Sequence, residues 1–339
     1  MSTVLVTGGA GFIGSHVAER LLARGHSVTV LDDLSGGFEQ NLPAGTRFVR
    51  GSVTDHELVD RVFGEGRFDY VYHIAAYAAE GLSHFIRRYN YTSNVIGSVN
   101  VINAAVNHDA RGLVFASSIA VYGSSPELPV TEATPLRPED PYGVAKHAVE
   151  CDLRSSCSMF GLKFVIFRPH NVFGPRQNIG DPYRNVVGIF MNQILQGLPM
   201  TIFGDGTQTR AFSYIDDVAP LMADAIETPA AWNQVFNIGA DTPSTLNDLA
   251  RRVASAMGVP QQVVHLPARH EVRHMHASHE CLTRVFGERQ KTPLDEGLAR
   301  MAAWVRAHGA RRGSAFQAIE ISKNLPASWA TPVTNDRSG

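Results

Sequence analysis

The sequence predicts an α/β fold in which helices cover both faces of a parallel sheet. Six apolar segments rich in β-branched residues follow one another through the first half of the chain, and amphipathic stretches such as His16–Ala23 separate them. Continuous apolar strands that alternate with helices are typical of a doubly wound parallel sheet. The predicted strands are TVLVTG, HSVTVLD, RFVRG, FDYVYHIAA, GLVFASS and KFVIFRP.

A second, smaller domain of mixed α/β structure is predicted from about Pro175, where loops lengthen and Gly204-Asp205-Gly206 interrupts the pattern. We expect the two domains to be interleaved. The expected first, larger domain covers 1–170 with a returning segment near 211–240, and the expected second, smaller domain covers 171–312. A C-terminal tail covers 313–339, and we expect its last eight or so residues to be disordered.

Composition excludes several classes of function. The 339 residues carry a net charge of −2, so no basic field predicts nucleic-acid binding, and no apolar run reaches the roughly 18 residues that span a bilayer. Thr3–Val6 already has the pattern of a strand, so we expect no signal peptide. The three cysteines, Cys151, Cys157 and Cys281, form no disulfide framework, which favours a reduced, cytoplasmic protein.

The segment VTGGAGFIGS places glycines at a spacing of three, Gly8, Gly11 and Gly14, between the first strand and the first helix. Gly8 permits a tight turn, Gly11 lets the backbone approach a pyrophosphate, and Gly14 lets the helix pack closely on the strand. The phosphates would then meet the positive end of the helix. The pattern predicts a Rossmann-type dinucleotide site, although a chance glycine turn is the alternative.

The second predicted strand ends in Asp32 and Asp33. An acidic residue at this place binds ribose hydroxyls and repels a 2'-phosphate, which favours NAD over NADP. An acidic cap for the next segment is the alternative, and arginines in an expected loop over Arg47–Arg50 leave NADP open.

Two polar motifs predict acid–base chemistry. Tyr142 and Lys146 are four residues apart on a predicted helix, so an ammonium near the phenol would lower its pKa and make Tyr142 a general base. Ser117 and Ser118 end a predicted strand at the carboxyl edge of the sheet, where Ser118 could relay a proton to Tyr142. The alternatives are a pair on the helix surface and a serine that only caps a turn.

Taken together, VTGGAGFIG, Asp32, SSIAVYG, YGVAK, RPHNVFGPRQ and GDGTQTRAFSYIDDV resemble the extended short-chain dehydrogenase/reductase superfamily. The chain is most similar there to the NAD-dependent nucleotide-sugar epimerases of the UDP-glucose 4-epimerase type, from Val4 to about Gly287. The resemblance implies a catalytic set of Ser118, Tyr142 and Lys146. It also implies a UDP-sugar substrate held by Ser117, Ser118, Tyr142, Asn171, Arg210, Arg269, Glu271 and Arg273, of which Arg269 or Arg273 would supply a second phosphate contact.

The resemblance likewise implies a set of residues around NAD. These are Gly8, Gly11, Phe12, Ile13, Gly14, Asp32, Asp33, Ser35, Gly36, Ser52, Val53, Ala75, Ala76, Asn94, Tyr142 and Lys146. The chain departs from the family pattern at Ser52, where an Asp commonly contacts adenine, and at Ala78, Met275 and Ser278. These departures leave the identity of the sugar open.

The implied reaction is inversion at carbon 4 of a UDP-sugar through a transient 4-keto intermediate with tightly held NAD. UDP-glucose and UDP-galactose are the default pair. UDP-glucuronate and UDP-galacturonate are the rival pair, since Arg176 or Arg184 could face a carboxylate. As in the family, two helices over about 94–106 and 142–160 would form a homodimer interface.

Four alternatives remain. A dehydratase of the superfamily carries an Asp-Glu pair where Ile119 and Ala120 stand, which disfavours elimination of water. A decarboxylase carries a Glu at the second position, which disfavours decarboxylation somewhat less, and a reductase would consume cofactor. A non-catalytic NAD-binding sensor or interaction protein is the alternative of another class. Five histidines, His265, His270, His274, His276 and His279, lack the cysteines or paired carboxylates of a metal site, so no metal is expected.

Overall fold

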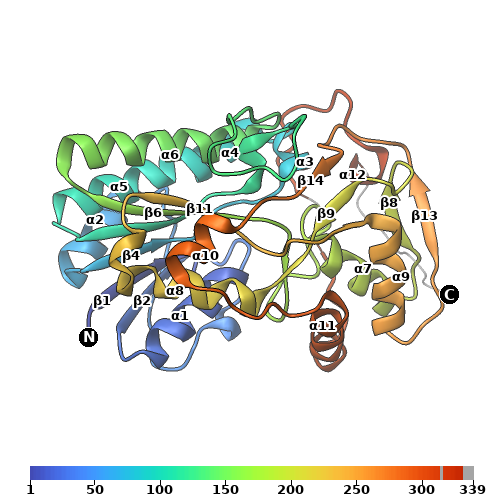
Figure 1. Cartoon of the computed structure of the whole chain (residues 1–339), viewed down its shortest axis with the longest axis horizontal. Coiled ribbons are helices and arrows are strands. Elements are labelled where there is room, and N and C mark those ends of the chain that lie inside the picture. The colour runs from blue at the N-terminus through green and yellow to red at the C-terminus, as the bar shows by residue number, and fades with distance from the viewer. Residues whose placement is uncertain (314–315, 331–339) are drawn as a thin grey trace.

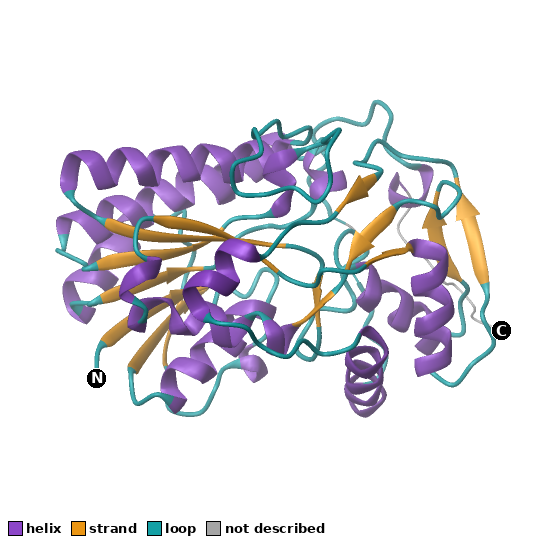
Figure 2. Cartoon of the chain, viewed as in Figure 1, coloured by secondary structure: helices purple, strands orange, loops and turns teal. Residues whose placement is uncertain are grey.

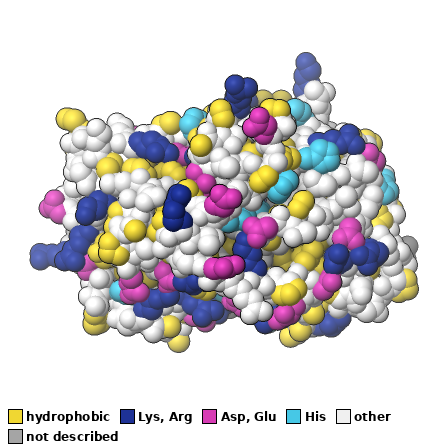
Figure 3. All heavy atoms as spheres, in the orientation of Figure 1, with side chains coloured by type: hydrophobic (Ala, Val, Ile, Leu, Met, Phe, Trp, Pro, Cys, Tyr) yellow, Lys and Arg dark blue, Asp and Glu magenta, His cyan; other side chains and the backbone are white. Residues whose placement is uncertain are grey.

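A parallel sheet between two layers of helices forms one side of the molecule, and shorter strands and helices form the other (Figures 1 and 2). The computed structural model describes residues 1–313 and 316–330. The expectation of disorder at the C-terminal end falls on 331–339, outside the described residues. No helix in the described ranges is both long and apolar enough to cross a membrane. Cationic and anionic side chains intersperse on the face shown in Figure 3.

The large sheet has seven strands, all paired in parallel, in the order β11-β6-β5-β4-β1-β2-β3. This confirms the predicted parallel sheet and its six strands. Arg47–Arg50, which we also expected as an arginine-rich loop, is instead the edge strand β3. The strands are β1 (Thr3–Thr7), β2 (Ser27–Asp32), β3 (Arg47–Arg50), β4 (Tyr70–His73), β5 (Gly112–Ala116), β6 (Lys163–Pro169) and β11 (Gln234–Ile238).

Alternate residues of the central strands feed two separate hydrophobic cores. Val4 and Val6 of β1 pack in the cluster that contains α1 (Phe12–Ala23) and α8 (Ala219–Asp224), whereas Leu5 packs in the cluster on the opposite face. Helices α2 (His56–Gly66), α5 (Gly97–Asn107) and α6 (Pro141–Phe160) cover that second face (Figure 1). Successive strand residues point to opposite faces, which is why the strands are apolar throughout.

Beyond β6 the chain forms three small sheets of short strands, in the orders β10-β7, β12-β9-β14 and β13-β8. Their strands and the remaining α-helices are α3 (Glu80–Ser83), α4 (Arg87–Tyr91), β7 (Val172–Phe173), α7 (Val186–Leu195), β8 (Met200–Phe203), β9 (Thr209–Ala211), β10 (Ser213–Tyr214), β12 (Pro243–Thr245), α9 (Leu246–Ala256), β13 (Val263–Leu266), β14 (His274–Met275), α10 (Glu280–Phe286), α11 (Leu294–His308) and α12 (Ala327–Ala330). A π-helical turn at Thr92–Ile96 joins α4 to α5, and 3₁₀ turns lie at Glu39–Asn41, Ile119–Tyr122, Ile215–Asp217, Ala225–Glu227 and Pro229–Ala231.

Helix α6 is defined at both ends by local chemistry. The Asp140 side chain accepts a hydrogen bond from the Gly143 amide at 2.9 Å, and Pro141 occupies the first turn. The helix ends at Gly161, whose φ of 76° suits glycine. These caps fix Tyr142 in the first turn, at the carboxyl edge of the sheet.

His73 at the end of β4 is a fully buried, neutral imidazole. Ser98 Oγ donates to the Asn94 carbonyl at 2.7 Å, so His73 Nε2 donates to Ser98 at 2.8 Å. His73 Nδ1 then accepts from Thr7 Oγ1 at 2.7 Å. Burial, reinforced by the Lys146 ammonium, lowers the pKa of His73 to about 3.

We therefore expect this imidazole to make the protein less stable in acid. Because the unfolded state takes up a proton near pH 6.5 and the folded state does not, stability is lost as the pH falls from about 6.5 toward 3. The contribution of His73 is roughly 1 kcal/mol per pH unit. Urea unfolding of wild type and His73→Asn at several pH values measures it, and an unchanged slope in the variant would refute the assignment.

Candidate active site

A cavity of about 420 Å³ lies at the carboxyl ends of the parallel strands, between the large sheet and the smaller part of the chain. Open α/β sheets bind ligands at this edge because the loops that follow the strands converge there. The turn after β1, the ends of β2, β4 and β5, and the start of α6 line one side. Residues around β8 and β9 line the other.

The glycine turn after β1 presents backbone rather than side chains to the cavity. Gly8 has a φ of +72°, and a Cβ there would lie 2.6 Å from the Ala75 nitrogen. A Cβ on Gly14 would lie 2.1 Å from the Gly8 carbonyl oxygen, so only glycine lets α1 approach β1. Helix α1 begins at Phe12, and no side chain caps its N-terminus. This cradle fits the pyrophosphate of a dinucleotide, whose negative charge meets the amide dipoles of α1.

Gly14→Ala is expected to lose most of the bound dinucleotide and about 1–3 kcal/mol of stability, because the new methyl group overlaps the Gly8 backbone. Gly64→Ala in α2 is the matched control, since its nearest neighbour would be His108 at an ordinary 3.5 Å. Nucleotide released from each purified variant by denaturation, measured by chromatography, gives the result. Wild-type nucleotide content in Gly14→Ala would refute the role of this turn.

The two aspartates after β2 have different surroundings. Asp32 is buried and accepts hydrogen bonds from the amides of Ala10 at 3.0 Å and Leu34 at 2.8 Å, so it braces the glycine turn. Burial raises the pKa of Asp32, and these amides oppose the shift. Asp33 is exposed and accepts from the Ser35 amide at 2.9 Å. Both line the cavity, where either carboxylate could meet a ribose.

Ser118, Tyr142 and Lys146 line the same cavity, and each is nearly buried. Lys146 Nζ donates to the Ala116 carbonyl at 2.7 Å and lies 5.8 Å from the centre of the Tyr142 ring. The Tyr142 amide donates to Ser83 Oγ at 3.2 Å, which ties α6 to α3. Ser118 Oγ accepts from the Ala120 amide at 3.1 Å, so Ser118 caps a 3₁₀ turn and also faces the cavity.

The charge balance at Tyr142 differs from the sequence expectation. Burial and then the Glu80 carboxylate raise the pKa of the phenol, and a hydrogen bond with Ser118 lowers it by less. Lys146 is itself affected, because burial lowers its pKa to about 7 while Glu150 opposes that shift. Its raised pKa makes Tyr142 a neutral phenol near neutral pH, so the predicted lowering of this pKa by Lys146 is not found.

A buried ion pair lies beneath these side chains. Arg168 binds Glu150 through Nε at 2.9 Å and Nη2 at 2.5 Å, and both side chains are at most 2% exposed. Arg168 Nη1 also donates to Tyr122 Oη at 2.7 Å. Ser117 lines the cavity, but its hydroxyl donates to Glu150 Oε1 at 2.6 Å. This bond corrects the expectation that the Ser117 hydroxyl faces a substrate.

Asn171, Arg210, Arg269 and Glu271 line the opposite side of the cavity. Arg210 on β9 donates to the carbonyls of Thr209 and Val272, and Arg269 pairs with Glu271 at 2.9 Å. The planar guanidinium groups offer paired donors that suit a diphosphate.

Two predicted site residues do not line this cavity. Arg273 is exposed and binds Asp205 at 3.3 Å and Thr207 at 2.9 Å, so Arg269 is the better placed of the two candidate arginines. Asn94 is buried; it accepts from the Tyr77 amide at 2.8 Å and donates to the Tyr77 carbonyl at 3.1 Å. The Asn94 side chain thus fixes the loop after β4 and does not line the cavity. Every other predicted residue of the cofactor set lines the cavity.

Residues 4–239 match the NAD-dependent epimerase/dehydratase family. The chain belongs to this family. A UDP-glucose 4-epimerase of Mycolicibacterium smegmatis is 34% identical over 311 residues, which are 89% of this chain and 98% of that protein.

Two solved structures have the same fold. The UDP-glucose 4-epimerase of Thermotoga maritima with UDP-glucose has a TM-score of 0.85 and 34% identity, covering 90% of this chain and 99% of that one. The Thermus thermophilus UDP-glucose 4-epimerase in complex with NAD has a TM-score of 0.83 and 37% identity, covering 89% and 98%.

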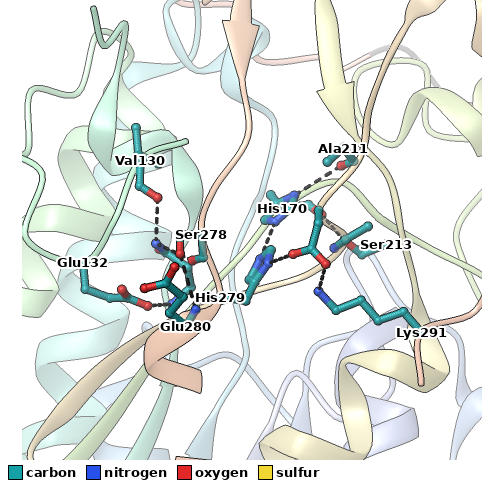
Figure 4. A network of polar contacts seen from close by, with 12 residues as sticks. Val130, Glu132, His170, Ala211, Ser213, Ser278, His279, Glu280 and Lys291 are labelled. Carbon is teal, nitrogen blue, oxygen red and sulfur yellow. Dashed lines mark hydrogen bonds and ion pairs between the residues drawn. The ribbon is translucent and has the colours of Figure 1, made fainter. Parts of the chain in front are cut away.

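The loop that carries Asn171 in this member of the family is anchored by two stacked histidines (Figure 4). His170 Nε2 and His279 Nε2 are 3.0 Å apart, and His279 Nδ1 lies 2.5 Å from Asp241 Oδ1. Lys291 pairs with Asp241 from the other side. The network joins the end of β6 to the start of α10. Within the described residues, no group of three or more potential ligands could hold a metal ion.

Several residues that line the cavity were not predicted from the sequence. Glu80, Tyr77, Tyr183, Phe203 and Gln208 line the cavity although no motif marks them. Glu80 is accessible from the cavity but lies among protein atoms. The resulting loss of solvation raises the pKa of its carboxyl group, and the positive charges of Arg210 and Arg269 oppose this shift. Glu80 begins the four-residue helix α3, which is too short to give a periodic signal in the sequence.

Proposed function

We propose that this family member is a UDP-sugar 4-epimerase that retains NAD through the catalytic cycle. The observation that carries the proposal is the shared cavity. The glycine turn, the Ser118–Tyr142–Lys146 group and the arginines at 210 and 269 all line it. A nucleoside diphosphate sugar could therefore contact its phosphate-binding and acid–base residues at the same time as the dinucleotide occupies the turn.

In this proposal Tyr142 takes the proton of the 4-hydroxyl and returns it from the same position after the sugar has turned. Ser118 bridges the hydroxyl and the phenol through hydrogen bonds, and Lys146 places a positive charge close to Tyr142. Arg210 and Arg269 keep the diphosphate in place while the keto sugar rotates. When bound, NAD⁺ supplies the acceptor and donor of hydride at carbon 4.

The raised pKa of Tyr142 makes the phenol dependent on added positive charge. A cation beside a phenol favours the phenolate, so a positively charged ring bound near Tyr142 would lower its pKa toward neutrality. Tyr142 would therefore act as a base only while oxidised NAD⁺ is bound.

Elimination of water and decarboxylation receive less support. Ile119 and Ala120, which follow Ser118, are buried and cannot exchange protons. A non-catalytic NAD-binding sensor would have no need of Tyr142, Lys146 and Ser118 in one cavity. The same proposal assigns residues 1–170 and the segment near 211–240 to the cofactor, and 171–312 mainly to the substrate.

The charges of the cavity favour a neutral sugar over a uronate. Arg176 pairs with Glu19 at 2.8 Å and does not line the cavity. Arg184 does line it, but it pairs with Asp181 at 2.7 Å and lies against Gly36. Glu80 has no such ion pair among the described residues, and burial raises its pKa. A uronate carboxylate beside it would meet its negative charge or force Glu80 to take up a proton, whereas hydroxyls of a neutral sugar could donate to its oxygens.

Proton NMR of the purified protein with UDP-glucose or UDP-glucuronate tests this proposal. We expect UDP-galactose from UDP-glucose without net NADH, and slower conversion of UDP-glucuronate by about tenfold or more. Glu80→Gln should narrow that difference by about tenfold, since one like charge is removed. Faster conversion of the uronate by wild type would overturn the choice of sugar. If NAD is bound but neither sugar nor its N-acetylated counterparts react, the sensor alternative is favoured instead.

We also propose that α5 and α6 pair with the same helices of a second copy. Large apolar side chains are exposed near or on them, with Ile96 52%, Met159 75% and Phe160 62% accessible. Light scattering of wild type and of Met159→Glu/Phe160→Glu tests the homodimer, which the double variant should weaken.

A further inference from the structure

The chain returns to the cavity after α11 and packs against the outside of its wall. The Phe316 ring lies 4.9 Å from the centre of Tyr89 and 5.5 Å from that of Tyr77, and the Phe316 amide donates to Tyr183 Oη at 2.9 Å. Tyr77, Tyr89 and Tyr183 all line the cavity. This contact places the start of the segment 316–330 directly behind cavity residues.

Backbone hydrogen bonds fix the middle of the segment. The amides of Glu320 and Ile321 donate to the Phe85 carbonyl at 2.8 and 3.2 Å. The Glu320 carboxylate accepts from the amides of Arg88 and Tyr89 at 2.8 and 2.9 Å, which lie at the start of α4. The segment is therefore attached to the stretch between α3 and the start of α4.

Trp329 lies near the C-terminal end of the segment 316–330, and only 7% of its surface is exposed. Its ring packs edge to face with Tyr183 at 5.3 Å and with Phe203 at 5.8 Å. The Arg269 guanidinium lies 5.5 Å from the Trp329 ring and 4.6 Å from the Phe203 ring, so it contacts two aromatic faces. Trp329 also lies behind Gly81, where a Cβ would be 3.1 Å from the indole.

Arg269, Phe203 and Gly81 line the cavity, whereas Trp329 does not. The tryptophan therefore acts from the second layer of the wall. Stacking on aromatic faces restricts the guanidinium before a ligand arrives, and a group that is already oriented loses less entropy on binding. Without Trp329, Arg269 would keep its Glu271 partner and Phe203 but would lose one of the two rings.

We propose that the C-terminal segment is part of the substrate site and that Trp329 is a positioning residue for Arg269. This inference rests on the proposed function, because it requires that Arg269 binds the diphosphate of a UDP-sugar. It predicts that Trp329 affects binding of the nucleotide and leaves the chemical step unchanged, since Arg269 would hold the diphosphate equally in the ground and transition states.

Calorimetry with UDP as the probe, together with steady-state kinetics on UDP-glucose, tests the proposal in NAD-loaded protein. Trp329→Ala should raise the Kd for UDP and the KM about tenfold, with kcat within about twofold and NAD content unchanged. Trp329→Phe, which keeps a ring, should stay within about threefold of wild type. Trp304→Ala in α11 controls for loss of a tryptophan elsewhere.

A double-mutant cycle separates positioning from loss of structure. Adding Trp329→Ala to Arg269→Ala should cost little further affinity, because the residue to be positioned is gone. Glu320→Ala, which weakens the attachment and leaves Trp329 present, should raise the Kd about threefold. Equal UDP affinity of wild type and Trp329→Ala, or full additivity in the cycle, would overturn the inference alone. A wild-type protein that holds NAD but binds no UDP would refute the proposed function and this inference with it.

Discussion

Tyr142→Phe is expected to slow epimerisation by about 10²–10⁴-fold, the usual contribution of a positioned acid–base group. The ring stays in the same buried position at the start of α6, so NAD content and melting temperature should remain close to wild type. Tyr91→Phe makes the same chemical change outside the cavity lining and should retain full activity. Turnover is measured by coupled assay of the product sugar.

If Tyr142→Phe keeps its fold and its NAD and still turns over at nearly the wild-type rate, the assignment of Tyr142 as the base is refuted. The pH profile gives a second check. Because burial and Glu80 raise the pKa of the phenol, Glu80→Gln should lower that pKa and shift the acidic limb of kcat/KM, where activity rises with pH, to lower pH.

Glu150→Gln is expected to destabilise the protein by about 3–5 kcal/mol, because it leaves the buried Arg168 guanidinium without its counter-charge. The same change removes the negative charge that supports the charge of Lys146, although the Gln carbonyl oxygen can still accept from the Ser117 hydroxyl. Removing that support lowers the pKa of Lys146 further, so activity near neutral pH should fall as well. Denaturant unfolding measures the loss of stability.

The exposed pair of Arg47 and Glu65 provides the control. These side chains lie 2.8 Å apart and are more than half exposed, so Glu65→Gln should cost less than about 1 kcal/mol. Replacing both buried partners, with Glu150→Leu and Arg168→Met, should recover much of the stability because no uncompensated charge remains. A loss below about 1 kcal/mol in Glu150→Gln would contradict this account of the ion pair.

Much of the large sheet was predictable because each of its first six strands is an apolar segment bounded by polar residues. Strand β11 joins β6 only after an intervening chain of more than sixty residues, so local pattern alone does not specify that pairing. Strands such as β7 and β10 have two residues each, too few to show a period of two. The packing of Trp329 behind Gly81 likewise depends on contacts distant in sequence.

The parts of the site carried by local motifs were predictable, and the parts carried by side-chain direction were not. The glycine turn and the Tyr142–Lys146 spacing each depend on neighbouring residues, and the structure places them at one cavity. Asn94, Arg273 and Ser117 have suitable chemistry, but their partners at Tyr77, Asp205 and Glu150 are remote in sequence. The pKa of Tyr142 depends on Glu80, which no motif linked to it.

The most direct test of the proposed reaction is the fate of deuterium placed on carbon 4 of UDP-glucose. If the hydrogen leaves and returns within one closed site, the label stays on carbon 4 in both UDP-glucose and UDP-galactose at equilibrium, and NMR and mass spectrometry will show no exchange with water. Deuterium in the solvent, or at carbon 6 as expected of a dehydratase, would contradict 4-epimerisation through hydride return.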